Sequence, residues 1–585
     1  MRVRMNFQLL LYVLCAIIIS ACGISPQEGS DAEPTPMSEE PALLDEDISG
    51  SDDELLAEAL QSLQEELGAE GCTYNLYIMG WVMDWADAGN IVDTVFGPDS
   101  DFQYTFWELS YPDLADKFRD IAYKAYREVD FEDRARLWGE AEDILVDDVV
   151  MVLPMFYSED ITLFNTDVSF YLPPFGAPRY SSWSSKSGAT TLVLPAGGDP
   201  LTLDTTLSVG TGPGIIYQLV DSPYTFTEDG SIEPLAATGF DVSEDGTVYT
   251  VHLREDALWS DGEPVLAQHF VDGILRLLDP STAANYAYVM MGIEGAPEYV
   301  SGEADTLDSV TAIDDYTFQF TLSEPLAYFD SLLAFSTFQP VRLDLIEAFP
   351  DSYTQPGIIV SNGAYVLKEY VIGSHLMLEK NPLYWNAENV SYERIEIPII
   401  PEPATCLAAF ESGDIDATTC GFPLGEIPRW VDRPEFVRVP QPGLYYLGIN
   451  TLADHTDDPD FRKALNYALD RRIINDVILD SPWKIEARGI IPPEIYGYQG
   501  DAVGFDFDAG IAREHLARYM TREGIHDPGE IVLEVWISGG WEDVVEAYQV
   551  MWEENLGIDV RFISTEWKTN INMFETCKGI GMQDQ

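Results

Sequence analysis

The segment 74–85, YNLYIMGWVMDW, joins a run of apolar residues to a carboxylate. Its aromatic and branched residues up to position 82 predict a buried strand, with Gly80 as a hinge-like interruption. Asp84 follows between Trp81 and Trp85, and Asp87 comes three residues later. A carboxylate at a strand end beside tryptophans is poorly solvated. A cationic partner therefore stabilises it by more free energy there than in water. The spacing predicts that Asp84, with Asp87 as second candidate, either binds a cation or caps the following loop.

The rest of the chain offers little catalytic or metal chemistry. Its six His residues are scattered without an HExxH motif or another paired spacing, so no metal site is predicted. Residues 209–214, VGTGPG, are Gly-rich but lack the strand–helix context of a phosphate-binding loop, and they predict a turn. Neither a catalytic triad nor a Cys/His pair can be recognised. We therefore expect a protein that is not an enzyme and has no cofactor.

Composition narrows the class of protein further. The 585 residues suggest two to four domains with a large core. Lys and Arg number 31 against 101 Asp and Glu, a formal net charge of −70, and such a surface does not bind nucleic acid. The acid excess also fits a saline habitat, although charge bears on solubility and not on fold.

The first 22 residues have the order of a secretory signal. Arg2 and Arg4 precede a short apolar core at 7–20, which is too short to span a membrane. The sequence ISAC then ends at Cys22 and resembles the lipobox of bacterial lipoproteins, in which the Cys receives lipid after cleavage. The resemblance implies that Cys22 anchors the protein to a bacterial membrane, outside the cytoplasm in the periplasm or at the cell surface. An ordinary signal peptide with a chance Cys is the alternative.

Residues 23–71 contain many acids and neither Lys nor Arg. Their composition predicts a disordered acidic tether. Within it, 51–68 carries Ser51 as a helix cap, acids in the first turn and leucines at helical spacing, which predicts one amphipathic helix.

From residue 190 onward, motifs follow one another in a characteristic order. They occupy 190–206, 240–279, 361–386, 406–418, 444–451, 460–478, 489–493 and 507–520. Within the second, EDG predicts a hairpin turn, TVYTVHL a strand and LAQHFVDGILRLL an amphipathic helix. Together the motifs resemble family 5 solute-binding proteins of bacterial ABC importers, the dipeptide and oligopeptide binders, over nearly all of 190–575.

The family resemblance implies an α/β fold with two lobes, the periplasmic-binding-protein-like class II fold of the peptide-binding type. Crossing strands join the lobes, and the ligand is enclosed at the hinge. GLYYLGIN (443–450) and LYIMGWV (76–82) are the strands we expect to cross. Aromatic residues and small pivots suit strands that line a closing cleft.

The order of the segments differs from that of the family. The family's closing strand-plus-acid segment is missing after 564–577, and matching stretches occur instead at 74–97 and 130–164. We interpret the chain as circularly permuted, with 181–188, SSWSSKSG, joining the ancestral ends. A rearranged gene that encodes a non-functional product is the alternative.

This interpretation divides the chain into five parts. Residues 1–22 are the lipoprotein signal peptide, and 23–71 are the tether. Residues 72–155 form the ancestral C-terminal part of lobe 2. Residues 156–444 form lobe 1, with a subdomain at about 225–345, and 445–585 complete lobe 2.

The resemblance also implies binding roles for particular residues. In peptide binders of the family, the acid three residues after the GW tryptophan pairs with the α-ammonium of the peptide, and Asp84 matches that position. The cleft-lining residues implied in the same way are Trp81, Trp85, Tyr445, Tyr446 and Asn450, each of which could equally be core. Ile78 stands where oligopeptide binders carry an Arg, and 87–90 lacks the usual proline. A sugar or another amine therefore remains an alternative ligand.

Four cysteines remain after the signal and the lipidation site are set aside. Cys406 and Cys420 flank one helix–strand unit and predict a local disulfide. Cys72 and Cys577 flank the new ends of the permuted chain, where a bridge would close the ring.

The resulting expectation is a monomeric lipoprotein that captures peptides or similar small solutes and delivers them to an ABC permease. A binder of oligosaccharides is the alternative on the same fold. An enzyme or a structural lipoprotein on this scaffold is the alternative of another class, because fold alone does not decide function.

Overall fold

The computed structural model describes residues 74–208, 212–479, 481, 483–538, 541–565, 570–571, 573–574 and 577. All of them belong to one of the two units of the chain, 64–585. Outside the described residues lie the signal, the tether with its predicted helix at 51–68, Cys22 and Cys72. In the described part, no helix has the length and apolar character needed to cross a membrane.

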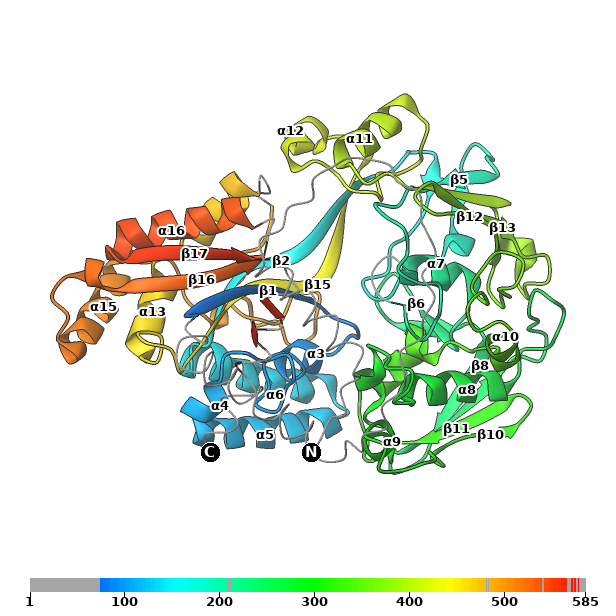
Figure 1. Ribbon diagram of the computed structural model, residues 1–585, viewed down its shortest axis with the longest axis horizontal. Coiled ribbons are helices and arrows are strands. Elements are labelled where there is room, and N and C mark those ends of the chain that lie inside the picture. Colours follow the sequence, from blue (N-terminus) through cyan, green and yellow to red (C-terminus); the bar gives the residue numbers. More distant parts are fainter. Residues whose placement is uncertain are drawn as a thin grey trace, which may run out of the picture. The chain divides into compact units, whose positions relative to one another are not determined.

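The early strand β1 lies inside a five-stranded sheet (Figure 1). The strand order is β17-β16-β1-β15-β2, with bounds Asp559–Thr565, Val532–Ser538, Leu76–Val82, Phe436–Ile449 and Val152–Leu163. Leu76 stands opposite Ile449 in the antiparallel pairing with β15 and opposite Val535 in the parallel pairing with β16. Segments from the front and the back of the chain therefore build one sheet.

The strand predicted at 74–82 is confirmed, and its two faces enter different cores. Leu76 and Ile78 pack in one hydrophobic cluster, whereas Tyr77 and Met79 pack in another. Successive side chains of a strand point to opposite faces, so a strand buried on both faces has no polar stripe. This accounts for the unbroken apolar run in the sequence.

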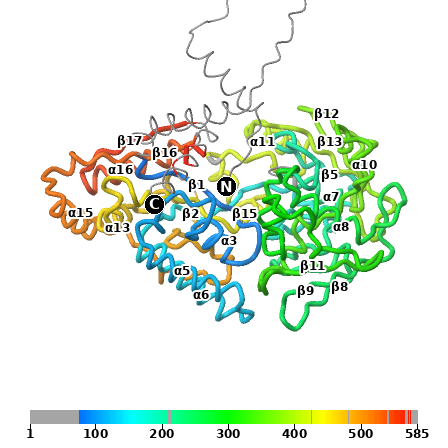
Figure 2. Tube along the Cα trace, turned by 60° about the horizontal axis from the view of Figure 1, so that its bottom comes forward, coloured from blue at the N-terminus to red at the C-terminus, as the bar shows by residue number. Residues whose placement is uncertain are grey.

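Two groups of helices cover these faces. One contains α3 Gly89–Val92, α4 Trp107–Ser110, α5 Pro112–Arg127 and α6 Phe131–Asp143; the other contains α13 Pro459–Tyr467, α14 Arg471–Ile473, α15 Ala509–Glu523 and α16 Glu542–Leu556. Figure 2 shows α5 and α6 together, apart from α13, α15 and α16. The Asp130 side chain caps α6 by accepting from the backbone N–H groups of Glu132 and Asp133.

The other lobe contains two four-stranded sheets. One has the order β12-β13-β14-β5 and the other β10-β11-β9-β8. The bounds are β5 Thr191–Val193, β8 Ala237–Val242, β9 Val248–Leu253, β10 Val310–Asp314, β11 Thr317–Thr321, β12 Tyr365–Val371, β13 His375–Lys380 and β14 Arg394–Pro398. The predicted hairpin is confirmed, because β8 pairs antiparallel with β9, and β9 buries every second residue.

Short strand pairs and six helices complete this lobe. The strand pairs are β3 Val168–Ser169 with β4 Ser184–Ser185 and β6 Tyr224–Phe226 with β7 Ile232–Pro234. The helices are α7 Gly212–Leu219, α8 Ala267–Leu278, α9 Ala296–Val300, α10 Leu343–Ala348, α11 Pro403–Ser412 and α12 Ile427–Trp430. The amphipathic helix predicted from LAQHFVDGILRLL is α8, which buries Phe270, Ile274 and Leu277 on one face.

The strands that cross from one lobe to the other are β2 and β15 (Figure 1). They pair antiparallel from Val152 opposite Gly448 to Leu163 opposite Phe436, with register shifts near Pro440. The sequence predicted β15 for this role together with β1. The second long crossing strand is β2, because β1 ends at Val82 and its pairing with β15 covers only 443–449 of that strand.

The described ends of the chain meet in space. The ring of Phe574 lies 5.1 Å from that of Tyr74 and 5.0 Å from that of Tyr77, centroid to centroid. Cys577 is buried and disulfide-bonded. Because Cys72 lies outside the described residues, the predicted pairing of Cys72 with Cys577 stays a prediction.

The segment predicted to join the ancestral ends is built into the lobe. Trp183 is 1% exposed and packs on Phe164 and Tyr180. Ser187 donates to the carboxylate of Asp167 through its backbone N–H and its hydroxyl. The chain runs from β4 through the exposed residues 186–190 into β5, and Asp167 holds the start of this loop at Ser187.

Candidate ligand-binding cleft

Two neighbouring cavities lie beside the crossing strands. The Asp84 cavity, of about 580 Å³, is bordered by 82–84, by 172–176 and Pro178, and by Tyr217, Tyr286, Phe335, Ser336, Val439 and Gln441. The aromatic cavity, of about 550 Å³, is bordered by seven aromatic residues, Phe156, Phe164, Tyr180, Trp183, Phe422, Tyr445 and Trp541, together with aliphatic and polar ones. Leu172, Pro178 and Val439 border both cavities, and each volume falls within the range of about 300–1,000 Å³ of small-molecule sites.

One buried amide holds the turn that follows β1. The side-chain oxygen of Asn90 accepts hydrogen bonds from the indole N–H of Trp81 at 2.9 Å and from the backbone N–H of Asp84 at 3.2 Å. Asn90 is fully buried in α3. The Asp84 carboxylate is thereby fixed at the wall of the cavity.

The electrostatic state of Asp84 suits a bound cation. Burial raises the pKa of its carboxyl from 3.8 to about 6, while a hydrogen bond donated by the Tyr288 hydroxyl to Oδ2 acts in the opposite direction. In the described part of the chain, no Lys or Arg side chain forms an ion pair with Asp84. At neutral pH the site therefore presents a partly desolvated negative charge that a ligand ammonium would stabilise.

Tyr288 belongs to the other lobe, and the lobes touch on this side. The rings of Trp85 and Tyr328 stack at a centroid distance of 5.2 Å. Arg127 forms an ion pair with Glu324, and the backbone N–H of Ala327 donates to the carbonyl of Tyr126. These contacts close the edge of the cleft nearest to Asp84.

The other predicted residues of the 81–87 segment have protein partners. Asp87 is 4% exposed, forms an ion pair with Arg134 at 2.9 Å and accepts from the backbone N–H of Gly89. Trp81 packs on Phe102 and does not border either cavity. Asp87 therefore fits the role of a loop cap that the sequence left open, and Asp84 is the carboxylate that faces a cavity.

The three residues predicted on β15 and directly after it lie in different places relative to the sheet. Tyr445 borders the aromatic cavity, where its ring lies 4.7 Å from that of Trp541. Tyr446 points to the opposite face and is 1% exposed in the core. Asn450 is 2% exposed, and its side-chain amide donates to the carbonyl of Tyr74. Only Asp84 and Tyr445 of the predicted ligand contacts border the two cavities.

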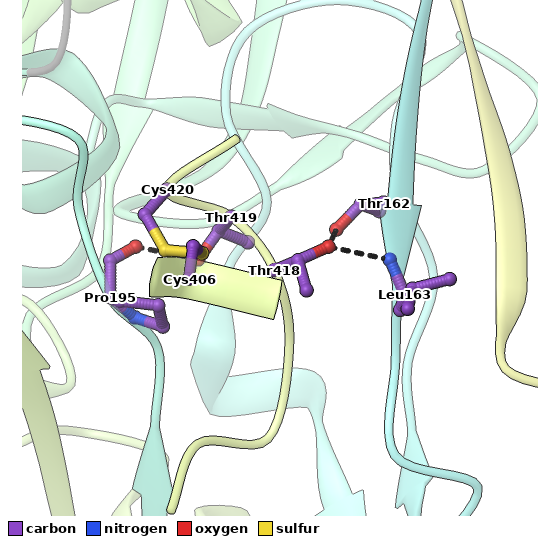
Figure 3. Close-up of a disulfide and its surroundings, with 7 residues drawn as sticks. All are labelled: Thr162, Leu163, Pro195, Cys406, Thr418, Thr419 and Cys420. Carbon is purple, nitrogen blue, oxygen red and sulfur yellow. Dashed lines mark hydrogen bonds between the residues drawn. A yellow bond between two sulfur atoms is a disulfide. The ribbon is translucent and has the colours of Figure 1, made fainter. Parts of the chain in front are cut away.

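The predicted local disulfide Cys406–Cys420 is present (Figure 3). It lies beside Thr418 and Thr419, which border the aromatic cavity. Its Cα atoms are 6.1 Å apart, and both cysteines are buried. Next to it, the Thr418 hydroxyl accepts from the backbone N–H of Leu163 at 2.8 Å, and the Thr419 hydroxyl donates to the carbonyl of Pro195 at 2.7 Å. The disulfide and these bonds join the wall to β2 and to the chain after β5.

Several residues of the cleft were not identified from the sequence. They include the segment 172–178, Tyr288, Lys484, Trp541 and the rings of Phe156, Phe164, Tyr180, Trp183 and Phe422. The sequence LPPFGAP at 172–178 could have indicated an extended segment at the surface of a cleft, because Pro and Gly disfavour helices and central strands. Among the described residues, no group of three or more His, Cys, Asp or Glu side chains is arranged to hold a metal ion.

Comparisons with known proteins agree with the fold. The family described as bacterial extracellular solute-binding proteins, family 5 Middle, matches residues 231–577. The chain is 36% identical over 358 residues to the periplasmic oligopeptide-binding protein OppA of Escherichia coli K12, covering 58% of this chain and 64% of that protein. It is 30% identical over 399 residues to the oligopeptide-binding protein OppA of Bacillus subtilis 168, covering 66% of this chain and 72% of that protein.

Solved structures of the family share the fold. The Escherichia coli murein tripeptide binding protein MppA matches with a TM-score of 0.53 and 29% identity, over 65% of this chain and 76% of that one. The two-lobed α/β fold predicted from the sequence is thereby confirmed. The chain spans 64% of the length of E. coli OppA, and the family match leaves β1 and β2 outside it. This chain belongs to the family 5 bacterial extracellular solute-binding proteins.

Proposed function

We propose that this protein captures peptides through their free α-amino group and delivers them to an ABC importer. The observation that carries the proposal is the Asp84 carboxylate, which borders a cavity, has a raised pKa and has no cationic partner among the described residues. A peptide ammonium supplies the missing positive charge. The related OppA proteins are named for oligopeptides, and MppA for a murein tripeptide.

The two cavities are large enough to hold more of a peptide than its amino group. Because the Asp84 cavity and the aromatic cavity share three wall residues, a ligand held at Asp84 can extend toward Tyr445. The proposal gives Tyr445 a direct contact with the ligand. It gives Trp81, Trp85, Asp87, Tyr446 and Asn450 supporting roles in the turn and the sheet that hold Asp84 and Tyr445 in place.

The proposal places the protein outside the cytoplasm as a monomer with a lipid anchor at Cys22. The amino-terminal order of basic residues, apolar core and ISAC supports it. Cys22→Ser is expected to release the protein from membranes without changing its melting temperature. Retention of that variant in the membrane fraction after a high-salt wash would reject the anchor.

We further infer that the chain is circularly permuted. The central place of β1 between β15 and β16 and the contact of Phe574 with Tyr74 support this inference. A rearranged chain in which 74–188 follows residue 577 is expected to fold and to bind the same ligands. Failure of that chain to fold would count against the inference.

Titration calorimetry with tri-alanine and its N-acetylated form tests the function. We expect tri-alanine to bind and the acetylated peptide to bind poorly. Asp84→Asn should weaken tri-alanine by one to three decades, about 2–4 kcal/mol, because a buried charge loses its partner. Asp305→Asn, at an exposed site outside both cavities, is the matched control and should leave the affinity unchanged. Equal affinity for acetylated and free peptides would reject Asp84 as the amine site.

A further inference from the structure

We propose that the aromatic cavity is a second subsite that selects an aromatic side chain of the bound peptide. The inference rests on the proposed function and adds a ligand preference to it. No feature of the Asp84 site requires such a preference, because an α-ammonium is common to all peptides with a free amino terminus. The preference follows instead from the composition and the contacts of the aromatic cavity.

The rings around this cavity form two groups. In the first, Tyr445 lies 4.7 Å from Trp541 and 5.2 Å from Phe156, measured between ring centroids. In the second, Trp183 lies 4.9 Å from Tyr180 and 5.6 Å from Phe164. Among the described residues no ring of one group pairs with a ring of the other, although both groups border the same cavity. The cavity of about 550 Å³ that both groups border therefore has room for a further ring.

The two groups come from different parts of the fold. Tyr445 and Trp541 pack against the core of the five-stranded sheet, on the side of α16. Trp183 belongs to the core of the other lobe, and Tyr180 packs against that core. A ring bound between them would bridge the lobes, so it would stabilise the closed arrangement in which Asp84 meets Tyr288.

Four polar side chains of the cavity wall already have hydrogen-bond partners in the protein. Glu159 accepts from the indole N–H of Trp483 at 2.8 Å, and Asp160 accepts from the side chain of Gln441. The hydroxyls of Thr418 and Thr419 are also hydrogen-bonded. A guest that seeks hydrogen bonds gains little from these groups, whereas an apolar ring gains the uncovered aromatic surface.

One charged group in the cavity is also compatible with an aromatic guest. The ammonium of Lys484 lies 5.1 Å from the centroid of Phe156. Burial lowers the pKa of Lys484, and Glu159 and Asp160 act in the opposite direction. The Lys484 ammonium lies over the ring of Phe156, and it can also attract the face of a second ring that a ligand brings into the cavity.

Titration calorimetry with tripeptides tests the subsite. The peptides are Ala-Ala-Ala, Ala-Phe-Ala, Ala-Ala-Phe and the same two with cyclohexylalanine in place of Phe. We expect one Phe peptide to bind about tenfold more tightly than Ala-Ala-Ala and more tightly than its cyclohexylalanine counterpart. Equal affinities across the series would overturn the subsite while leaving peptide binding intact. Absence of binding by every tripeptide would reject the proposed function itself.

Two variants locate the preference in the structure. Trp541→Ala removes a partly exposed ring before α16, and Phe422→Ala removes one near the disulfide. Each should lower the Phe-to-Ala affinity ratio about fivefold. Phe349→Ala, at a ring 43% exposed and outside both cavities, is the matched control and should leave the ratio unchanged. An unchanged ratio in the two cavity variants would overturn the assignment.

A photo-crosslinking tripeptide gives a readout that does not depend on the folding of any variant. With benzoylphenylalanine in place of the preferred Phe, we expect adducts on the segments that carry Tyr180, Tyr445 or Trp541. Adducts confined to other segments would overturn the assignment.

Discussion

The Asp84 cavity and the aromatic cavity have similar volumes but differ in the side chains that border them. The first is bordered by one carboxylate, whose charge has no cationic partner among the described residues, whereas the second is bordered by seven rings together with the charged side chains of Glu159, Asp160 and Lys484. A buried charge is stabilised by a group of opposite charge, whereas an aromatic surface binds many apolar groups with different affinities. The comparison suggests that one end of the cleft decides whether a peptide binds and the other decides which peptides bind best.

Removal of the disulfide should have the largest effect on the protein, and it should change ligand binding at the aromatic cavity but not at the Asp84 cavity. Cys406→Ala/Cys420→Ala frees the wall that carries Thr418, Thr419 and Phe422, and closure of a loop of this length is worth about 3 kcal/mol. We expect the free energy of unfolding to fall by about that amount in urea titrations. The aromatic preference should fall with it, while the requirement for a free amino group stays. Loss of the amino requirement instead would show that the cavities are not independent.

Asp84→Asn should separate stability from binding. Because the pKa of Asp84 in the folded protein lies above its ordinary value of 3.8, its ionisation destabilises the folded state as the pH rises from about 4 to about 6. At pH 7.5 the variant should therefore be more stable than the native protein without ligand, by about 3 kcal/mol. The gain should vanish at pH 4. Thermal unfolding at both pH values measures it, and equal stability at pH 7.5 would contradict the burial of an unbalanced charge.

The pH should act on one cavity alone. With a pKa of about 6, Asp84 is mostly protonated at pH 5 and ionised at pH 7.5, so tri-alanine should bind about tenfold more weakly at pH 5. The ratio between Phe-containing and tri-alanine affinities should not change over this range. A pH-independent affinity for tri-alanine would contradict the amine site.

Tyr288→Phe should have the smallest effect. It removes the hydrogen bond to Oδ2 but keeps the ring that packs on Phe102. Since that bond opposes the effect of burial, its loss should raise the pKa of Asp84 further and move the midpoint of the pH dependence upward. At pH 7.5 the affinity should fall only a few-fold, about 1 kcal/mol for a net hydrogen bond. A midpoint that stays or moves downward would contradict this account.

Local patterns in the sequence determined much of the fold. The unbroken apolar run at 74–82 predicted the strand β1, the EDG turn predicted the hairpin of β8 and β9, and the amphipathic stretch LAQHFVDGILRLL predicted α8. These elements are set by the 2.0 and 3.6 residue periods and by turn residues, which act over a few positions. The motif order likewise identified the family before any tertiary contact was known.

Only the tertiary structure decided which of the predicted residues face a cavity. Asp84 and Asp87 look alike in the sequence. In the fold, Asp87 forms an ion pair with Arg134 of α6, whereas the carboxylate of Asp84 accepts a hydrogen bond from the Tyr288 hydroxyl of the other lobe. Tyr445 and Tyr446 must point to opposite faces of β15 because side chains alternate along a strand. Which of those faces borders a cavity depends on the packing of Trp541 on one side and Phe96 on the other. Such pairings join residues far apart in the chain, and the period of a strand carries no information about them.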